Sequence, residues 1–206
     1  MKTHDFLLEL GTEELPPKLL VKLSSSLKDN IIKELKQLNI STSNVIAYAT
    51  PRRLAITIAE LQSKQQDQLI EKKGPSVESA DKAIEGFAKS CGVDISKLEK
   101  RSFGNKEYYF YKTQETGKNI QSLLPKIIES SINNIPITRA MKWGDLDYSF
   151  VRPVHWLVMM LDNEVVPAHI MGLESGNTTK GLRSNEDSLL EISHANKYQS
   201  FMLNKA

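Results

Sequence analysis

The sequence is poor in the residues that common catalytic and metal-binding motifs require. It has one cysteine, Cys91, among 206 residues, so no disulfide can form within the chain, and this fits a reducing compartment. It has four histidines, and it contains no glycine-rich phosphate loop, nucleophile elbow, HExxH motif or cysteine pair for zinc. These absences exclude the familiar signatures of P-loop nucleotidases, serine hydrolases and zinc proteins.

The sequence also lacks long apolar runs and a strong charge imbalance. No apolar run reaches the roughly eighteen residues of a membrane span, and Glu9 interrupts the first apolar stretch, so we expect neither a membrane partner nor a signal peptide. The formal net charge is only +2, which gives no global field for a nucleic acid. We therefore expect a cytoplasmic protein, in which any contact with RNA depends on local basic clusters.

Hydrophobic patterning predicts an α+β fold with mixed or antiparallel sheets and packed helices. Residues 6–10 are predicted to form a strand ended by Gly11. Leucine and isoleucine recur every three or four residues over 17–38, which predicts an amphipathic helix. Residues 45–49 and 53–61 are predicted to be strands, so the chain begins βαββ.

A polar connector over residues 62–68 predicts a domain boundary. We expect an N-terminal βαββ subdomain at 1–66 and a second α+β subdomain at 67–206, truncated at its C-terminus; one continuous domain is the alternative. The further elements predicted are a basic corner at 71–76, a helix at 78–91, a hairpin at 103–114 turning at Gly104-Asn105, a helix at 120–135, a strand at 189–192 and the start of a helix at 194–204.

The most apolar stretch, residues 154–171, is predicted to be a central hairpin that turns at Asp162-Asn163. Pairing of Leu161 with Glu164 would place Trp156 opposite His169. In this register the apolar residues of the hairpin cover both of its faces. Because side chains alternate between faces, its two histidines, His155 and His169, would point to opposite sides and could not share a metal ion.

Basic residues gather at the ends of predicted elements, several of them beside aromatic residues. Such arginines and lysines can contact phosphates, and neighbouring rings can stack on unpaired bases. The alternative is ordinary solvated charge, or pairing with Asp145 and Asp147. We predict no catalytic residue and no metal ligand. The candidate residues for contact with RNA or a partner protein are Arg52, Arg53, Lys72, Lys73, Arg139, Lys142, Trp143, Arg152 and Arg183.

Eight segments of the chain, taken in order, closely resemble the N-terminal part of the bacterial glycyl-tRNA synthetase beta subunit. They are FLLELGTEELPPKLL (6–20), ATPRRLAI (49–56), KKGPS (72–76), AIEGFAKSCGV (83–93), LLPKIIE (123–129), IPITRAMKWGD (135–145), FVRPVHWLV (150–158) and VVPAHIMG (165–172). The sequence departs from the family at Leu182 and Ser184, where histidine and phenylalanine are usual. This sequence has Arg139 and Lys142 where the family is expected to have lysine and arginine, respectively.

The resemblance implies the N-terminal region of a beta subunit in a tetramer of two alpha and two beta subunits. The alpha subunit would hold the aminoacylation site with its ATP and Mg, so this chain would need no cofactor. The chain would support ATP-dependent glycylation of tRNA-Gly by binding tRNA and docking the alpha subunit, with a second beta subunit as a further partner. Two alternatives are a non-catalytic assembly module without RNA contact, with Trp143 at the protein interface, and an editing-like tRNA deacylase domain.

Overall fold

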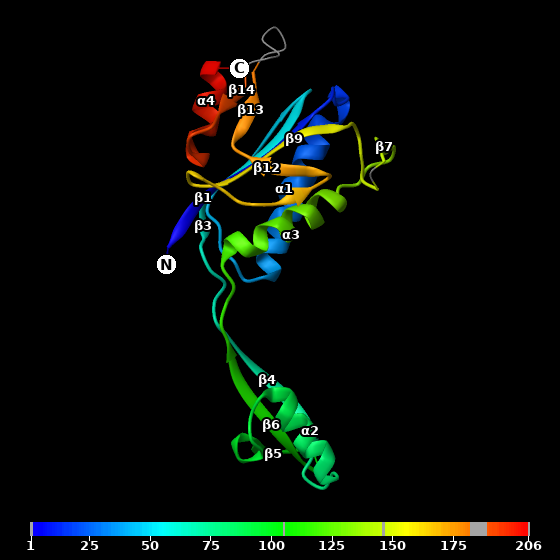
Figure 1. Cartoon of the computed structure of the whole chain (residues 1–206), viewed down its shortest axis with the longest axis vertical. Helices are drawn as coiled ribbons and strands as arrows, with labels where there is room; N and C mark the ends of the chain where they lie inside the picture. The colour runs from blue at the N-terminus through cyan, green and yellow to red at the C-terminus, as the bar shows by residue number, and fades with distance from the viewer. Residues whose placement is uncertain (1, 105, 146, 182–188, 206) are drawn as a thin grey trace. The chain divides into compact units, whose positions relative to one another are not determined.

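The computed structural model describes residues 2–104, 106–145, 147–181 and 189–205. It has the predicted α+β class, with helices packed on mixed and antiparallel sheets (Figure 1). The chain forms two compact units: unit 1 is Met1–Gln65 with Lys118–Ala206, and unit 2 is Gln66–Gly117. The chain leaves unit 1 after Gln65 and returns to it at Lys118. The strands and helices after residue 118 complete the sheet and core of unit 1.

Unit 1 is built on a seven-stranded sheet whose order is β11-β12-β9-β1-β3-β2, with β10 paired to β9. The pairs within it are antiparallel except for β12 and β9. The predicted strands at 6–10, 45–49 and 53–61 are confirmed as β1, β2 and β3. The strand bounds are β1 Thr3–Thr12, β2 Val45–Thr50, β3 Arg53–Gln62, β9 Val154–Leu161, β10 Glu164–Val165, β11 His169–Ile170 and β12 Leu173–Gly176.

Two helices cover one face of this sheet, α1 (Leu20–Gln37) after the short turn η1 (Pro17–Leu19), and α3 (Ile120–Asn133). The predicted apolar stripe of α1 is confirmed, since Leu27 and Ile31 are fully buried in the main core. Each such side chain contributes about 1.5–3 kcal/mol through burial. Among the described residues, none of the helices combines the length and hydrophobicity that a membrane span requires.

The opposite face of the sheet is covered by C-terminal elements. A second apolar cluster there joins Leu7, Val158 and Met160 to Ala195 and Tyr198. The predicted strand and helix near residues 189 and 194 are confirmed. The covering elements are β13 Thr178–Lys180, β14 Leu189–Glu191, η4 Ala195–Lys197 and α4 Tyr198–Lys205.

Strand β9 is buried on both faces, as predicted, and the predicted pairing of Leu161 with Glu164 is confirmed. The hairpin is shorter than predicted, and the expected placement of His169 opposite Trp156 is wrong. Pro167 has no N–H for the ladder, so the chain leaves β9 after Val166. Strand β12 takes its place beside β9, and His169 pairs with Glu174 in β12 instead.

Unit 2 is a three-stranded antiparallel sheet in the order β4-β6-β5, with one helix packed on it. The predicted helix and hairpin are confirmed, although Asn105 of the predicted turn lies outside the described residues. The predicted corner at 71–76 is wrong: it is the end of β4, with a bulge between Lys73 and Ser76. The bulge accommodates Pro75, which cannot donate to the ladder, and Gly74, whose missing side chain leaves room for the Phe87 ring. The bounds are β4 Gln68–Ser76, α2 Asp81–Cys91, η2 Ile95–Lys97, β5 Glu99–Phe103 and β6 Lys106–Glu115.

Candidate nucleic-acid interface

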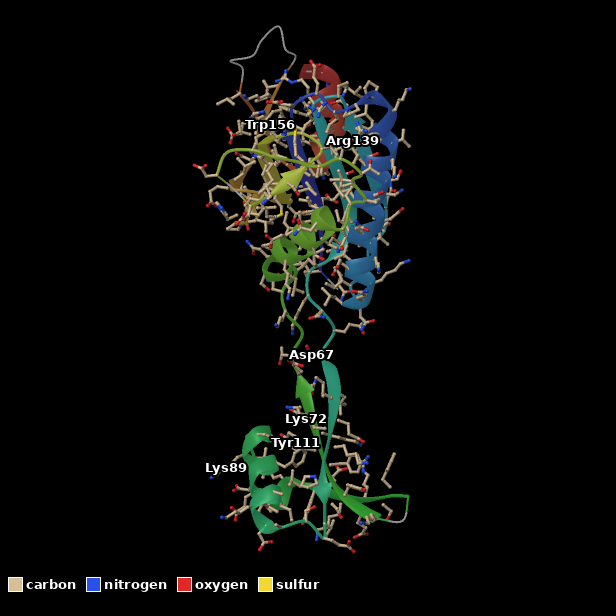
Figure 2. The ribbon with its side chains drawn as sticks, turned by 90° about the vertical axis from the view of Figure 1, so that its right-hand side faces the viewer. Asp67, Lys72, Lys89, Tyr111, Arg139 and Trp156 are labelled. Atoms are coloured by element: carbon tan, nitrogen blue, oxygen red, sulfur yellow. The ribbon has the colours of Figure 1, made fainter. Side chains whose placement is uncertain are left out.

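Three basic side chains from distant parts of the sequence line one pocket of about 340 Å³ in unit 1. Lys22 comes from the first turn of α1. Arg139 precedes and Arg152 follows a short hairpin formed by β7 (Met141–Lys142) and β8 (Ser149–Phe150). Leu23 and Val151 form part of the apolar wall. The pocket therefore combines two of the predicted contact residues with one that the sequence did not indicate (Arg139 is labelled in Figure 2).

The positive charges of this pocket are not neutralised by nearby carboxylates among the described residues. In the described part of the chain, no carboxylate forms an ion pair with Lys22, Arg139 or Arg152. Arg152 donates from Nη1 to the carbonyl of Val151 at 3.2 Å, which fixes its direction without neutralising it. Adjacent like charges without counter-charges produce a positive local potential that attracts an anion.

Lys142 and Trp143, on the same hairpin, have different surroundings. Lys142 is exposed and lies 3.4 Å from the carboxylate of Asp147, one of the pairings considered from the sequence. Trp143 is half-buried and packs against the main core. The four predicted residues at the entrance of β9 are thus divided among a pocket, a surface ion pair and a packed side chain.

Arg53 belongs to a buried ionic centre in the main sheet. Its guanidinium lies 3.5 Å from Glu9, which is fully buried on β1, and it donates to the Lys180 carbonyl at 2.7 Å. Glu9 also accepts hydrogen bonds from Trp156 Nε1 at 2.6 Å and from the hydroxyl groups of Thr179 and Tyr198. Burial, together with the negative charge of Glu9 and its hydrogen bond, raises the pKa of Tyr198 far above its ordinary value, so this hydroxyl remains a donor.

A second pocket, of about 600 Å³, lies where β2, β3 and α4 meet. Arg52 is half-buried on its wall, and Arg53 forms part of its lining beside Tyr198. Tyr48 and Met202 also line it, and the Arg53 guanidinium donates to the Met202 sulfur at 3.4 Å. Arg52 and Arg53 are neighbours in sequence, yet only Arg52 lies outside the buried ionic centre.

The remaining predicted residues lie in unit 2 or outside the described residues. Lys72 and Lys73 are both exposed on β4, but they point to opposite faces because strand side chains alternate. Lys72 lies on the face of Tyr111, which packs towards α2, and Lys73 lies on the other face. Arg183 lies outside the described residues, as do Leu182 and Ser184.

Two features of these candidate sites, Lys22 and the buried ionic centre, were not predicted from the sequence. Lys22 occupies the polar side of an amphipathic helix, where a lysine carries no special signal. The buried centre did carry a signal, since Glu9 interrupts the apolar run of β1, and a charge there must be paired when buried. Its partners come from four other elements, and no spacing along the sequence connects them.

One cluster of potential cation ligands also lies in unit 1, formed by Asp5, Asp162 and His194, whose ligand atoms lie within 4.8 Å of one another. The carboxylates already have protein partners. Asp162 accepts from the Asp5 backbone N–H at 2.7 Å and contacts His4 Nδ1 at 2.6 Å, and Asp5 accepts from Asn196 Nδ2 at 3.0 Å. The cluster is accounted for by these contacts, which join β1 to the β9–β10 turn and η4.

Fold and sites together define a protein of the α+β class with a sequestered ionic centre in its main sheet and a pocket lined by three cations. Comparison with known proteins identifies the family within this class. A family model for the glycyl-tRNA synthetase beta subunit matches residues 6–206. The chain therefore belongs to the glycyl-tRNA synthetase beta subunit family.

Individual relatives agree with this assignment. The chain is similar to the glycine–tRNA ligase beta subunit of Coxiella burnetii, with 40% identity over 98% of this chain and 30% of the relative. It is also similar to the beta subunit of Chromohalobacter salexigens, with 40% identity over 96% of this chain and 30% of the relative. The identity to the beta subunit of Erwinia tasmaniensis is 37%, over 100% of this chain and 31% of the relative. The chain thus spans about 30% of the length of these curated relatives.

Proposed function

We propose that this chain is the N-terminal portion of a cytoplasmic glycyl-tRNA synthetase beta subunit and that it binds the sugar-phosphate backbone of tRNA-Gly. The observation that carries the tRNA contact is the pocket of Lys22, Arg139 and Arg152, whose cations have no ion-pair partner among the described residues. A phosphate is the anion that RNA presents repeatedly, and arginine can bind it through two parallel hydrogen bonds. The chain would support ATP-dependent glycylation by holding tRNA, with ATP and Mg used by an alpha subunit.

Docking of the alpha subunit is the second candidate function, and a groove between α1 and β2 favours it. The groove is lined by Val21 and Ile46, and Val21 is 77% exposed. β2 is also the last strand at its side of the sheet, so its outer edge offers backbone groups to a partner. An editing-like deacylase role stays a prediction, which hydrolysis of alanyl- or seryl-tRNA by the chain would test.

The tRNA contact is tested in the full-length subunit with the double variant Arg139→Ala/Arg152→Ala. We expect weaker tRNA-Gly binding and a smaller salt dependence, with the slope of log K against log salt reduced by roughly 0.7–0.9 for each phosphate that the variant no longer neutralises. Filter binding over a range of salt concentrations measures both quantities. Lys142→Ala is the matched control, because it removes a cation from the same hairpin that is already paired with Asp147.

An unchanged salt slope in the double variant, or an equal loss of affinity in Lys142→Ala, would contradict the proposed contact. Copurification with the alpha subunit separates the second candidate. If Val21→Asp loses the alpha subunit while the arginine variant keeps its tRNA affinity, assembly and not RNA binding is the role of this region.

A further inference from the structure

The three-stranded sheet of unit 2 has one face covered by helix α2 and one face that carries aromatic and basic side chains. Tyr109 and Tyr111 pack towards α2, together with buried Ile84 and Ala88. In Figure 2 the helix, with Lys89 on it, lies to one side of strands β4 and β6. We name the other side the open face. Strand alternation and register place on it Lys73, Arg101, Phe103, Lys106, Tyr108, Phe110 and Lys112, with Glu71 and Glu99.

The aromatic rings of the open face are held by cations. The Lys73 ammonium lies 4.0 Å from the ring centroids of both Phe103 and Tyr108, and the Arg101 guanidinium lies 5.5 Å from the Phe110 centroid. Phe103 and Tyr108 meet edge to face, with centroids 6.5 Å apart. Phe103 is nevertheless 64% exposed, so much of its ring surface is free to receive another planar group.

The charge of the open face is predominantly positive, with four cations and two carboxylates. Both carboxylates are engaged by Arg101: Glu71 lies 3.0 Å from it, and Glu99 forms a closer pair. Lys112 lies 3.9 Å from Glu71. The contacts of Lys73 within the described residues are with rings, so its positive charge has no carboxylate partner there. An incoming anion would therefore meet Lys73 and Lys106 beside the exposed Phe103 ring.

We propose that the open face binds unpaired RNA nucleotides, with a base stacked on Phe103 and the neighbouring phosphates held by Lys73 and Lys106. Unpaired bases present their flat faces to aromatic side chains, whereas bases in a duplex are already stacked on each other. A protein partner is less favoured, because lysine and glutamate are depleted at the centres of protein interfaces. This assignment is independent of the pocket in unit 1, which would contact the backbone of tRNA.

The experiment measures binding of the 206-residue chain to a fluorescently labelled, unstructured RNA of about twelve nucleotides, and to a duplex of the same sequence. We expect preference for the unpaired strand. Phe103→Ala should weaken this binding about five-fold or more, the low end expected for loss of one base stack. Phe103→Trp should retain it. Lys73→Ala should also weaken binding, and Lys89→Ala on the exposed side of α2 is the matched control for loss of one lysine.

A second readout locates the contact directly. RNA containing 4-thiouridine, irradiated in the complex, should form cross-links within residues 99–112. Equal affinity of the original chain and Phe103→Ala for the unpaired strand would overturn the proposal, as would the absence of binding by the original chain. The proposal would also be overturned if the Phe103→Ala variant retained RNA binding but no longer bound the alpha subunit. The open face would then be a protein interface. Loss of tRNA binding in the Arg139→Ala/Arg152→Ala variant with retained oligonucleotide binding would separate the two sites.

Discussion

At the scale of single residues, the Gly11 backbone packs closely against the Trp156 ring. A side-chain carbon built on Gly11 would lie 1.8 Å from a ring atom, far inside van der Waals contact. The ring cannot move freely, because its Nε1 donates to the buried carboxylate of Glu9 at 2.6 Å. The glycine is therefore required by the position of the tryptophan and, through it, by the ionic centre.

Gly11→Ala should lower the free energy of unfolding of unit 1 by about 1–3 kcal/mol or more, through overpacking and the strained hydrogen bond. Urea unfolding followed by tryptophan fluorescence measures this, since both tryptophans, Trp143 and Trp156, lie in unit 1. Gly176→Ala is the control within unit 1, because a side-chain carbon there would meet only the Thr178 backbone nitrogen, at an ordinary contact distance of 3.9 Å. A stability of Gly11→Ala equal to that of the original chain would show that Trp156 can shift without cost.

At the scale of elements, the turn between β9 and β10 joins three segments of the chain. Asp162 adopts a positive φ of 53°, its side chain accepts from Asp5 and contacts His4, and its carbonyl accepts from Ala195 at 2.7 Å. Burial raises the pKa of Asp162, but the hydrogen bonds from His4 and the Asp5 backbone outweigh it. The pKa therefore falls below its ordinary value of 3.8.

When folding lowers the pKa of a carboxyl group, its ionised form stabilises the folded state. This stabilisation is fully present at pH above the pKa of the unfolded state, and it is lost as the pH falls through the pKa of the folded state. Asp162→Asn should thus be less stable than the original chain at pH 7, and the difference should shrink below about pH 4. Asparagine tolerates the positive φ, so the substitution tests the charge and not the turn. Urea midpoints of both proteins across this pH range provide the measurement; a difference independent of pH would assign the effect to shape alone.

The elements themselves could largely be predicted from the sequence, because their signals are local. The apolar spacing of α1 and the two-sided hydrophobicity of β9 both led to correct elements. The basic segment at 71–76 was misjudged because Gly74 and Pro75 usually mark a turn, whereas here they form a bulge within β4. The parallel pairing of β12 with β9 could not be predicted, since it depends on where the chain returns after Pro167.

The candidate sites were less accessible to sequence reasoning, because they are assembled across elements. Arg139 and Arg152 were identified as cations near the entrance of β9, but their meeting with Lys22 depends on how α1 lies against the β7–β8 hairpin. Arg53 was grouped with Arg52 by proximity, although alternation along β3 directs it to Glu9. Arg52 lies in the turn before β3. Within β4, alternation of side chains between the two faces separates Lys72 from Lys73.

At the scale of the whole molecule, the chain leaves unit 1 and returns to it at adjacent points. The backbone N–H of Gln65 donates to the carbonyl of Lys118 at 2.9 Å, and that of Ile120 donates to Ser63 at 2.9 Å. A bridge between Lys64 and Asn119 lies between these bonds. The two chain passages are therefore held together by unit 1 itself, and unit 2 has its own apolar cluster.

Replacing residues 67–116 by a short Gly-Ser linker of about four residues should consequently leave unit 1 folded. We expect its cooperative unfolding, followed by tryptophan fluorescence, to change by less than about 1 kcal/mol, because a short loop closes two ends that are already adjacent. The same variant should keep the proposed tRNA contact of the Lys22, Arg139 and Arg152 pocket and lose the proposed binding to the unpaired RNA strand. Loss of cooperative unfolding would show that unit 1 depends on unit 2, and retained binding of the unpaired strand would place that activity in unit 1.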